Sequence, residues 1–202
     1  EYDEMINLQK LIYFRKDLLK KFIKSDYKSA IDIGCGTGAD SIALTMNGLR
    51  VKGYDPSAKM IKKARENAKE FNTSIKFINS EFRIKSTDKD KTDIVVSLGN
   101  AFANIEQKNI CKIIKNVYAS LRHEGIFLFQ LLNYGLIRKE KKRIVNITEN
   151  GYNIFIRFYD IIKEGITFNI LTIQKKDLKE HNLITTELYE HSKDFLIKEL
   201  NK

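Results

Sequence analysis

Apolar residues alternate between helical and strand-like spacing along the first two thirds of the chain. Spacings of three and four residues predict helices at 4–24, 39–47, 57–71 and 106–121. Short apolar runs predict strands at 30–33, 50–54, 75–78, 93–98 and 126–132. The 93–98 strand is apolar on both faces, as is typical of a parallel sheet covered by helices. The pattern predicts an α/β protein with a Rossmann-like, doubly wound, mostly parallel sheet.

The pattern changes from about residue 143. Four segments there alternate and are rich in Ile, Phe, Tyr and Thr: 143–148, 152–162, 166–175 and 183–189. Asn150-Gly151 and Glu164-Gly165 separate the first three, which is typical of hairpins. We therefore expect an antiparallel β-meander inserted after the fifth strand, followed by a helix at 192–201. The expected domains are residues 1–135, the meander 136–190, and a helix 191–202 that returns to the first domain.

Charge and composition narrow the possible partners. The chain of 202 residues has a net charge of +10, and charged residues make up 31% of it. The lysines are dispersed, and the densest basic stretch, 138–143, contains an acid, which favours a solvated surface over a nucleic-acid interface. No apolar run approaches the roughly 20 residues of a membrane helix, so no membrane partner is expected.

The cysteines and histidines do not form a recognisable metal-binding pattern. Cys35 and Cys111 lack the spaced Cys or His companions of a zinc site, and the three histidines are scattered. We expect no metal and no disulfide framework. A reducing, cytoplasmic location fits this usage.

A glycine-rich turn lies between the first predicted strand and the next helix. It reads Asp32-Ile33-Gly34-Cys35-Gly36-Thr37-Gly38, and the second strand ends at Asp55. Glycines let a backbone turn sharply and approach a ligand, and an acid at the end of the next strand can accept from ribose hydroxyls. A dinucleotide site is formally allowed by Gly34, Gly36 and Ala39. Asp32 and Gly38 favour a methyltransferase turn instead. The sequence separation from Gly34 to Asp55 fits both a dinucleotide site and a methyltransferase site, so it does not distinguish them.

Three further stretches accompany this turn in the same order as in a known family. They are Cys35 to Ile42, Leu98-Gly99-Asn100-Ala101-Phe102-Ala103, and Asn133-Tyr134. With Val51 to Asp55 and Met60-Ile61, the chain resembles class I S-adenosylmethionine-dependent methyltransferases. Its motifs are most similar to the glycine N-methyltransferase branch, over roughly residues 30–175.

The resemblance implies a set of residues that bind S-adenosylmethionine. Gly34, Gly36 and Gly38 would line its methionine and ribose portion, and Asp32 would lie beneath its amino group. Asp55 would hold the ribose diol. The adenine would lie against Glu81 and Phe82, where the carboxylate accepts from the exocyclic amine and the Phe82 N–H donates to the ring. Leu98 completes the predicted cofactor-binding residues at the carboxyl end of the fourth strand.

The resemblance also implies residues for the methyl acceptor. Asn100 matches the Asn at the methyl-accepting centre of the glycine enzymes, where an amide orients an amine, and is the predicted catalytic residue. Asn133 and Tyr134 are the predicted substrate-binding residues. Two positions depart from the family: Leu132 replaces the Arg that binds the glycine carboxylate, and Asn104 replaces a His. Because a Leu cannot pair with a carboxylate, glycine is not the expected acceptor.

The expected function is methyl transfer from S-adenosylmethionine to a nitrogen or oxygen of a small molecule, with the meander as a lid. A nucleic-acid methyltransferase is the alternative that the charge favours. Adenine-N6 enzymes of that kind have a proline-bearing turn after the fourth strand, and the single proline here, Pro56, lies elsewhere. A non-catalytic S-adenosylmethionine-binding module is a further alternative. The class usually has two more strands after the last helix; their expected absence fits either a fragment or a short sheet.

Overall fold

The computed structural model describes residues 6–82, 91–141, 143–163 and 165–202. Residues 4 and 5 of the first predicted helix and residue 164 of a predicted hairpin turn lie outside them. The chain forms two compact units. We name them the parallel-sheet unit (7–102 and 108–131) and the antiparallel-sheet unit (1–6, 103–107 and 132–202). The domain boundaries expected from the sequence stay a prediction.

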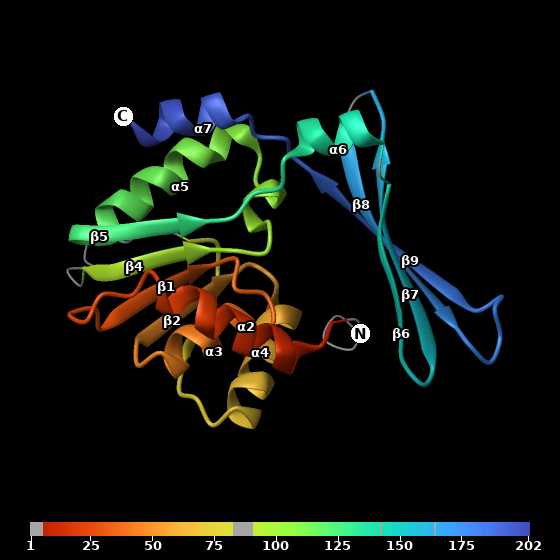
Figure 1. Cartoon of the computed structure of the whole chain (residues 1–202), viewed down its shortest axis with the longest axis horizontal. Coiled ribbons are helices and arrows are strands. Elements are labelled where there is room, and N and C mark those ends of the chain that lie inside the picture. Colours follow the sequence, from red (N-terminus) through yellow and green to blue (C-terminus); the bar gives the residue numbers. More distant parts are fainter. Residues whose placement is uncertain (1–5, 83–90, 142, 164) are drawn as a thin grey trace. The chain divides into compact units, whose positions relative to one another are not determined.

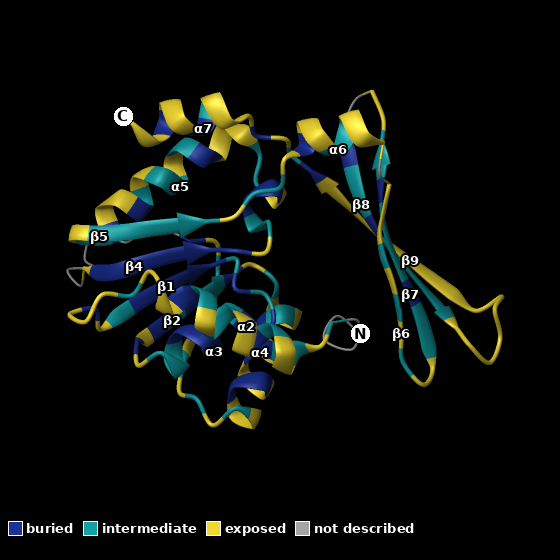
Figure 2. Ribbon diagram, in the orientation of Figure 1, coloured by how far each residue is buried: buried dark blue, intermediate teal, exposed yellow. Residues whose placement is uncertain are grey.

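A five-stranded parallel sheet forms the centre of the parallel-sheet unit (Figure 1). Its order is β3-β2-β1-β4-β5. The strands are β1 (Ser29–Ile33), β2 (Arg50–Asp55), β3 (Lys76–Asn79), β4 (Thr92–Ser97) and β5 (Leu121–Phe129). β4 is buried along its whole length, as its run of apolar residues predicts (Figure 2). The order reverses between β1 and β4, so the crevice at their carboxyl ends is where such sheets bind ligands.

Helices cover both faces of this sheet, which confirms the doubly wound prediction. They are α2 (Leu8–Lys20), α3 (Ala39–Met46), α4 (Ala58–Glu70) and α5 (Gln107–Ser120). Alternate strand residues point to opposite faces: Ile31 and Val95 pack against Val117 of α5, whereas Ile94 packs among residues on the α2 and α3 side. In Figure 1, α5 lies on one side of the sheet and α2, α3 and α4 on the other.

The fifth strand begins earlier than predicted. The sequence pattern predicted a helix up to residue 121 and a strand over 126–132, but β5 starts at Leu121 and ends at Phe129. The strand shifts register against β4 after Thr92↔Leu121, so these residues form a bulge. Glu124 adopts a left-handed φ of 60° there, and a Cβ on Gly125 would meet the Arg122 carbonyl oxygen at 3.0 Å. Gly125 is therefore a bulge residue within the strand.

The antiparallel-sheet unit contains the predicted meander. Its order is β6-β7-β8-β9, and the strands are β6 (Ile144–Glu149), β7 (Asn153–Ile161), β8 (Ile166–Gln174) and β9 (His181–Leu188). The final helix, α7 (Lys193–Leu200), begins after Ser192, whose hydroxyl accepts from Phe195 N. Helix α6 (Tyr134–Glu140) was not predicted. Its seven residues form too short an apolar pattern to be distinguished from a loop.

The amino ends of β1 and β4 are held by one carboxylate. Asp93 accepts hydrogen bonds from the backbone N–H groups of Lys28 and Ser29, both at 2.8 Å, and from Arg122 Nε at 2.5 Å. Burial raises the pKa of Asp93, but these donors outweigh it and hold the pKa below its usual value. Arg122 also contacts Asp26 and lies 5.2 Å above the Tyr27 ring.

Asp93→Ala is expected to lower the free energy of unfolding by about 2 kcal/mol at pH 7, because it leaves these donors without their acceptor. A carboxyl with a depressed folded-state pKa stabilises the protein above its unfolded pKa of about 3.9, and that contribution is lost as the pH falls through the folded value. Urea unfolding of both proteins at pH 7 and pH 3 should show the difference shrinking in acid. Asp26→Ala, at a more exposed carboxylate, is the control and should change stability little. An equal loss at both pH values would contradict the assigned role.

Two features are absent from the described residues. No helix in those ranges is both long and apolar enough to cross a bilayer. Nor do three or more His, Cys, Asp or Glu side chains converge there in a way that could hold a metal ion.

Candidate functional site

The glycine turn leaves β1 at the carboxyl edge of the parallel sheet and leads into α3. Gly34, Gly36 and Gly38 have positive φ values of 69°, 52° and 90°. Gly34 N donates to the Tyr54 carbonyl oxygen of β2 at 2.8 Å, which fixes the turn to the neighbouring strand. A Cβ placed on Gly36 would meet no atom within 4 Å, so open space adjoins the backbone there. The glycines thus form a loop that a ligand can approach closely.

Asp55 fastens the end of β2 to this loop. Its Oδ2 accepts from Gly36 N at 2.9 Å, and its Oδ1 accepts from Ser57 N at 2.8 Å. The residue is 9% exposed. Each carboxylate oxygen can accept a second hydrogen bond, so the group can also accept from two adjacent hydroxyls. The loop and the acid that the sequence analysis paired are therefore joined directly.

Asp32 lies beneath the loop and is 1% exposed. Its Oδ2 accepts from Ser41 Oγ at 2.6 Å. Burial, reinforced by the nearby negative charge of Asp40, raises the pKa of Asp32 to about 8. Burial likewise raises the pKa of Asp40, although Arg15 opposes that shift. A cation bound beside Asp32 would favour its ionised form and lower this pKa.

The turn after β4 lies directly against the glycine loop. Leu98 is buried, and Gly99 and Asn100 have positive φ values of 61° and 68°. The short 3₁₀ helix η1 (Ala101–Asn104) follows. A Cβ on Gly34 would come within 2.7 Å of the Ala101 Cβ, so only a glycine fits at position 34. This contact brings the predicted cofactor residues and the predicted catalytic Asn100 to one edge of the sheet.

The predicted adenine residues follow β3. Glu81 is exposed, whereas Phe82 is 5% exposed and packs edge-on against the Tyr54 ring, with 5.2 Å between centroids. The carbonyl oxygen of Phe82 accepts from Asn116 Nδ2 at 3.4 Å. The Phe82 side chain thus belongs to the core, and its backbone lies at the edge where adenine binding is predicted.

The two predicted substrate residues belong to the antiparallel-sheet unit. Asn133 caps α6, since its Oδ1 accepts from Leu136 N at 3.0 Å. Tyr134 is buried and packs edge-on against Tyr159 at 6.5 Å. Both residues have structural roles in that unit, and their binding role stays a prediction.

Two polar residues at the carboxyl edge of the parallel sheet were not predicted from the sequence. Arg15, on α2, makes an ion pair with Asp40 at 3.3 Å, and its Nη2 donates to Gln130 Oε1 at 3.2 Å. The same Gln130 oxygen accepts from Gly99 N at 3.3 Å. No local motif marks either residue, because their contacts join segments far apart in the sequence.

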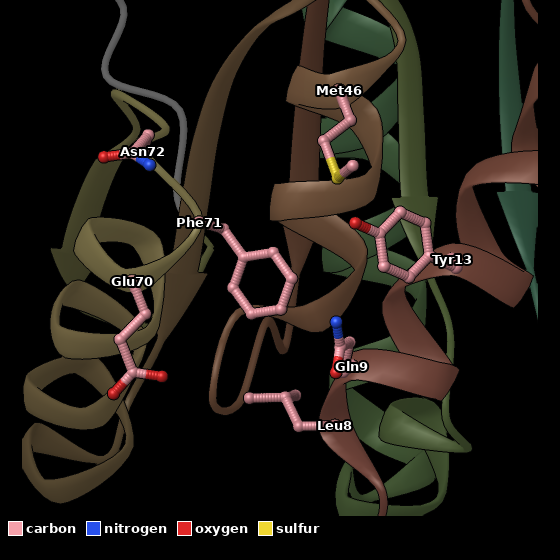
Figure 3. Close-up of a pocket in the computed structure, with 7 residues that line it drawn as sticks. All are labelled: Leu8, Gln9, Tyr13, Met46, Glu70, Phe71 and Asn72. Carbon is pink, nitrogen blue, oxygen red and sulfur yellow. The ribbon is translucent and has the colours of Figure 1, made fainter.

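A separate hollow lies at the other end of the helices (Figure 3). Its walls come from α2, the carboxyl end of α3, and the last residue of α4 with the two that follow. The lining residues are Leu8, Gln9, Tyr13, Met46, Glu70, Phe71 and Asn72. The glycine loop adjoins the amino end of α3, and none of the predicted site residues lines this hollow. It is therefore not part of the cofactor site.

The loop, Asp55 and the buried acids fit S-adenosylmethionine. The open space at Gly36 accommodates a close ligand, and Asp55 can accept from a ribose diol. The buried Asp32 and the half-buried Asp40 can offset the positive charge that a sulfonium and an ammonium carry. A five-stranded parallel sheet with this loop at its switch point defines a Rossmann-like nucleotide-cofactor enzyme.

Comparison with known proteins gives the family. Residues 30–125 match the family model described as a methyltransferase domain. The carboxy-S-adenosyl-L-methionine synthase of Nautilia profundicola is 33% identical over 94% of this chain and 74% of that protein. The glycine N-methyltransferase of Rattus norvegicus is 31% identical over 72% of this chain. The chain spans 52% of that relative's length.

A solved structure agrees with the fold. An amino pentose methyltransferase from Micromonospora echinaspora, solved with S-adenosylmethionine bound, superposes with a TM-score of 0.73 at 12% identity, covering 95% of this chain and 80% of that one. The chain belongs to the class I S-adenosylmethionine-dependent methyltransferases, and its cofactor is S-adenosylmethionine. The family and cofactor predicted from the sequence are confirmed.

Proposed function

We propose that this protein transfers the methyl group of S-adenosylmethionine to a nitrogen or oxygen of a small molecule. The contact between Gly34 and Ala101 carries the proposal, because it sets the cofactor loop directly beside the turn that bears Asn100. The bound cofactor supplies an electrophilic methyl on sulfur. The acceptor's lone pair would form the new bond as the S–C bond broke, and its N–H or O–H proton would pass to solvent. S-adenosylhomocysteine is released.

The chain's contribution in this proposal is to position the acceptor. Asn100 would accept from the acceptor N–H or O–H and so aim its lone pair at the methyl group. Asn100 has a left-handed φ of 68° and lies in a turn that packs against the glycine loop. Leu98, Glu81 and Phe82 would complete the cofactor site, and Asn133 and Tyr134 would contact the acceptor. The meander would serve as a lid, in a cytoplasmic enzyme.

The acceptor that we propose has no obligatory carboxylate beside its reacting atom. Leu132 offers only apolar contact where the resemblance implies a cation. Arg138 and Arg157, which could otherwise supply a cation, are both engaged within the antiparallel-sheet unit. Arg138 pairs with Glu190, and Arg157 Nε donates to Asn146 Oδ1 at 2.5 Å. A carboxylate without a partner would incur a desolvation cost of several kcal/mol.

The relative from Nautilia profundicola favours a second candidate function. That protein is named for making a carboxylated form of S-adenosylmethionine, and the similarity spans 94% of this chain. In this alternative the chain would form a carboxylated S-adenosylmethionine instead of transferring the methyl group. Arg138 and Arg157 are already bonded to Glu190 and Asn146, so neither is available to pair with that carboxyl group. We therefore place methyl transfer first.

The proposal is tested by a screen of small amines, amino acids, amino sugars and phenols with S-adenosylmethionine. The expected result is S-adenosylhomocysteine formation with at least one amine or phenol, and little with glycine or sarcosine. Asn100→Ala should lower kcat by about 100-fold while leaving cofactor affinity almost unchanged, since its contact is made to the acceptor. Mass spectrometry of the products separates the candidates, because a carboxylated cofactor would support the second one.

Two further measurements test the cofactor and the class of acceptor. Calorimetry should detect S-adenosylmethionine binding and no tight binding of nicotinamide dinucleotides. Total RNA incubated with labelled cofactor should remain unlabelled. Efficient glycine turnover would refute the argument from Leu132, and strong labelling of RNA would favour the nucleic-acid alternative. Cofactor binding without any turnover would favour a non-catalytic module.

A further inference from the structure

Arg15 contacts two segments that the proposed reaction must hold together. It lies on α2, and its side chain is only 13% exposed. Toward the cofactor loop, its Nε faces Asp40 Oδ1 at 3.3 Å, an ion pair without hydrogen-bond alignment. Asp40 is in the first turn of α3, immediately after the glycine loop. Arg15 therefore neutralises a half-buried acid beside the loop.

The other end of the guanidinium reaches the turn after β4. Arg15 Nη2 donates to Gln130 Oε1 at 3.2 Å, and that oxygen also accepts from Gly99 N at 3.3 Å. Gln130 is itself fixed by its backbone, because Gln130 N donates to the Ser97 carbonyl oxygen at 2.9 Å. The Gln130 amide oxygen thus links α2 to the Gly99 amide. We call this pair of hydrogen bonds, from Arg15 and from Gly99 to Gln130 Oε1, the relay.

The turn needs such support. Two successive residues with positive φ, of which Asn100 is not a glycine, form a conformation that persists only where the surroundings hold it. The relay holds it from the α2 side. On the other side, Ala101 N donates to the Leu98 carbonyl oxygen at 3.3 Å, and Phe102 stacks on Phe129 at 5.4 Å.

We propose that Arg15 is a positioning residue, which acts through Gln130 on the Gly99–Asn100 turn and through Asp40 on the start of α3. This role deepens the proposed function, since it sets where Asn100 stands relative to the cofactor loop. Arg15 touches neither reactant in this proposal. Its effect on the reaction passes through the Gly99 amide and the Asp40 carboxylate.

The test begins without any ligand, so it does not depend on the proposed function. Amide hydrogen exchange by NMR is compared in the parent protein, Arg15→Met, Gln130→Leu and the double variant. Loss of the relay should speed exchange at Gly99 by about tenfold relative to the core amides of Val95 and Val96, the effect of one hydrogen bond. Because both residues act through one link, the double variant should match Gln130→Leu rather than multiply the two effects.

Arg122→Met is the matched control. It removes an arginine with two carboxylate partners at the opposite end of the sheet. It should lower the stability of the whole protein and leave the ratio of Gly99 to Val95 exchange unchanged. Arg15→Lys should restore the Asp40 pair but not the relay, because a single ammonium replaces the two-sided guanidinium.

A second readout separates positioning from binding. With S-adenosylmethionine as the calorimetric probe, Gln130→Leu should bind normally, because the Gln130 side chain bonds to Arg15 and Gly99 and not to the glycine loop. With an acceptor from the screen, Gln130→Leu should lower kcat and leave the KM for the cofactor unchanged. Unchanged Gly99 exchange in Arg15→Met, or independent effects in the double variant, would overturn the proposal whatever the acceptor proves to be.

Discussion

Asp55→Ala is expected to weaken S-adenosylmethionine binding by about 10- to 100-fold, or about 1–3 kcal/mol. The variant removes the carboxylate that we expect to accept from the ribose diol. It also removes the acceptor of the Gly36 and Ser57 N–H groups, so the glycine loop loses its connection to β2. Isothermal calorimetry measures the change directly.

Asp55→Asn separates these two contributions. Its amide oxygen can still accept from one backbone N–H, but the opposite NH₂ group cannot accept from a hydroxyl. Its affinity should therefore lie between those of the parent protein and the alanine variant. Thermal unfolding checks that both variants fold. An unchanged affinity in Asp55→Ala would show that the ribose lies elsewhere.

Cofactor binding near pH 7 is expected to release about one proton, and Asp32→Asn should abolish that release. In the free protein, burial and then the charge of Asp40 raise the pKa of Asp32 to about 8, so the group is mostly protonated at pH 7. A bound cation favours the carboxylate and lowers this pKa. Affinity should accordingly rise with pH, by up to about tenfold per unit, until the pH passes about 8.

The free protein should show the opposite trend in stability. A group whose folded pKa is raised stabilises the protein fully below its unfolded pKa of about 3.9, and that contribution is lost as the pH rises toward 8. Calorimetry in buffers of different ionisation enthalpy counts the released proton. Asp93→Asn, far from the loop, is the matched control and should release the same proton. Equal proton release in Asp32→Asn would assign the titration to another group.

The fold was predictable where local pattern and tertiary structure agree. The loop between β1 and α3 and the Ser57 cap of α4 follow from glycine and capping chemistry, and parallel strands bring their carboxyl ends to one edge. Helix α6 was missed because seven residues carry little periodicity. The start of β5 was missed because a bulge interrupts its alternation at Gly125.

The candidate site divides in the same way. The glycine loop could be predicted, because its glycines and acids lie close together in the sequence and form a recognisable motif. Arg15 and Gln130 are 115 residues apart, and neither lies in a recognisable pattern. Their pairing depends on where α2 lies against the end of β5, which only tertiary packing determines.

The position of β1 between β2 and β4 has a consequence for the folding kinetics. The Ser97 hydroxyl of β4 donates to the Ile33 carbonyl oxygen across 64 residues, and the neighbouring β1–β4 register spans similar separations. Closing so long a loop is slow, because its entropy is lost before the contacts compensate. The contact between the glycine loop and Ala101 can form only after β4 has paired with β1. The cofactor should therefore prolong the lifetime of the native state by slowing unfolding, and it should leave the rate of folding unchanged.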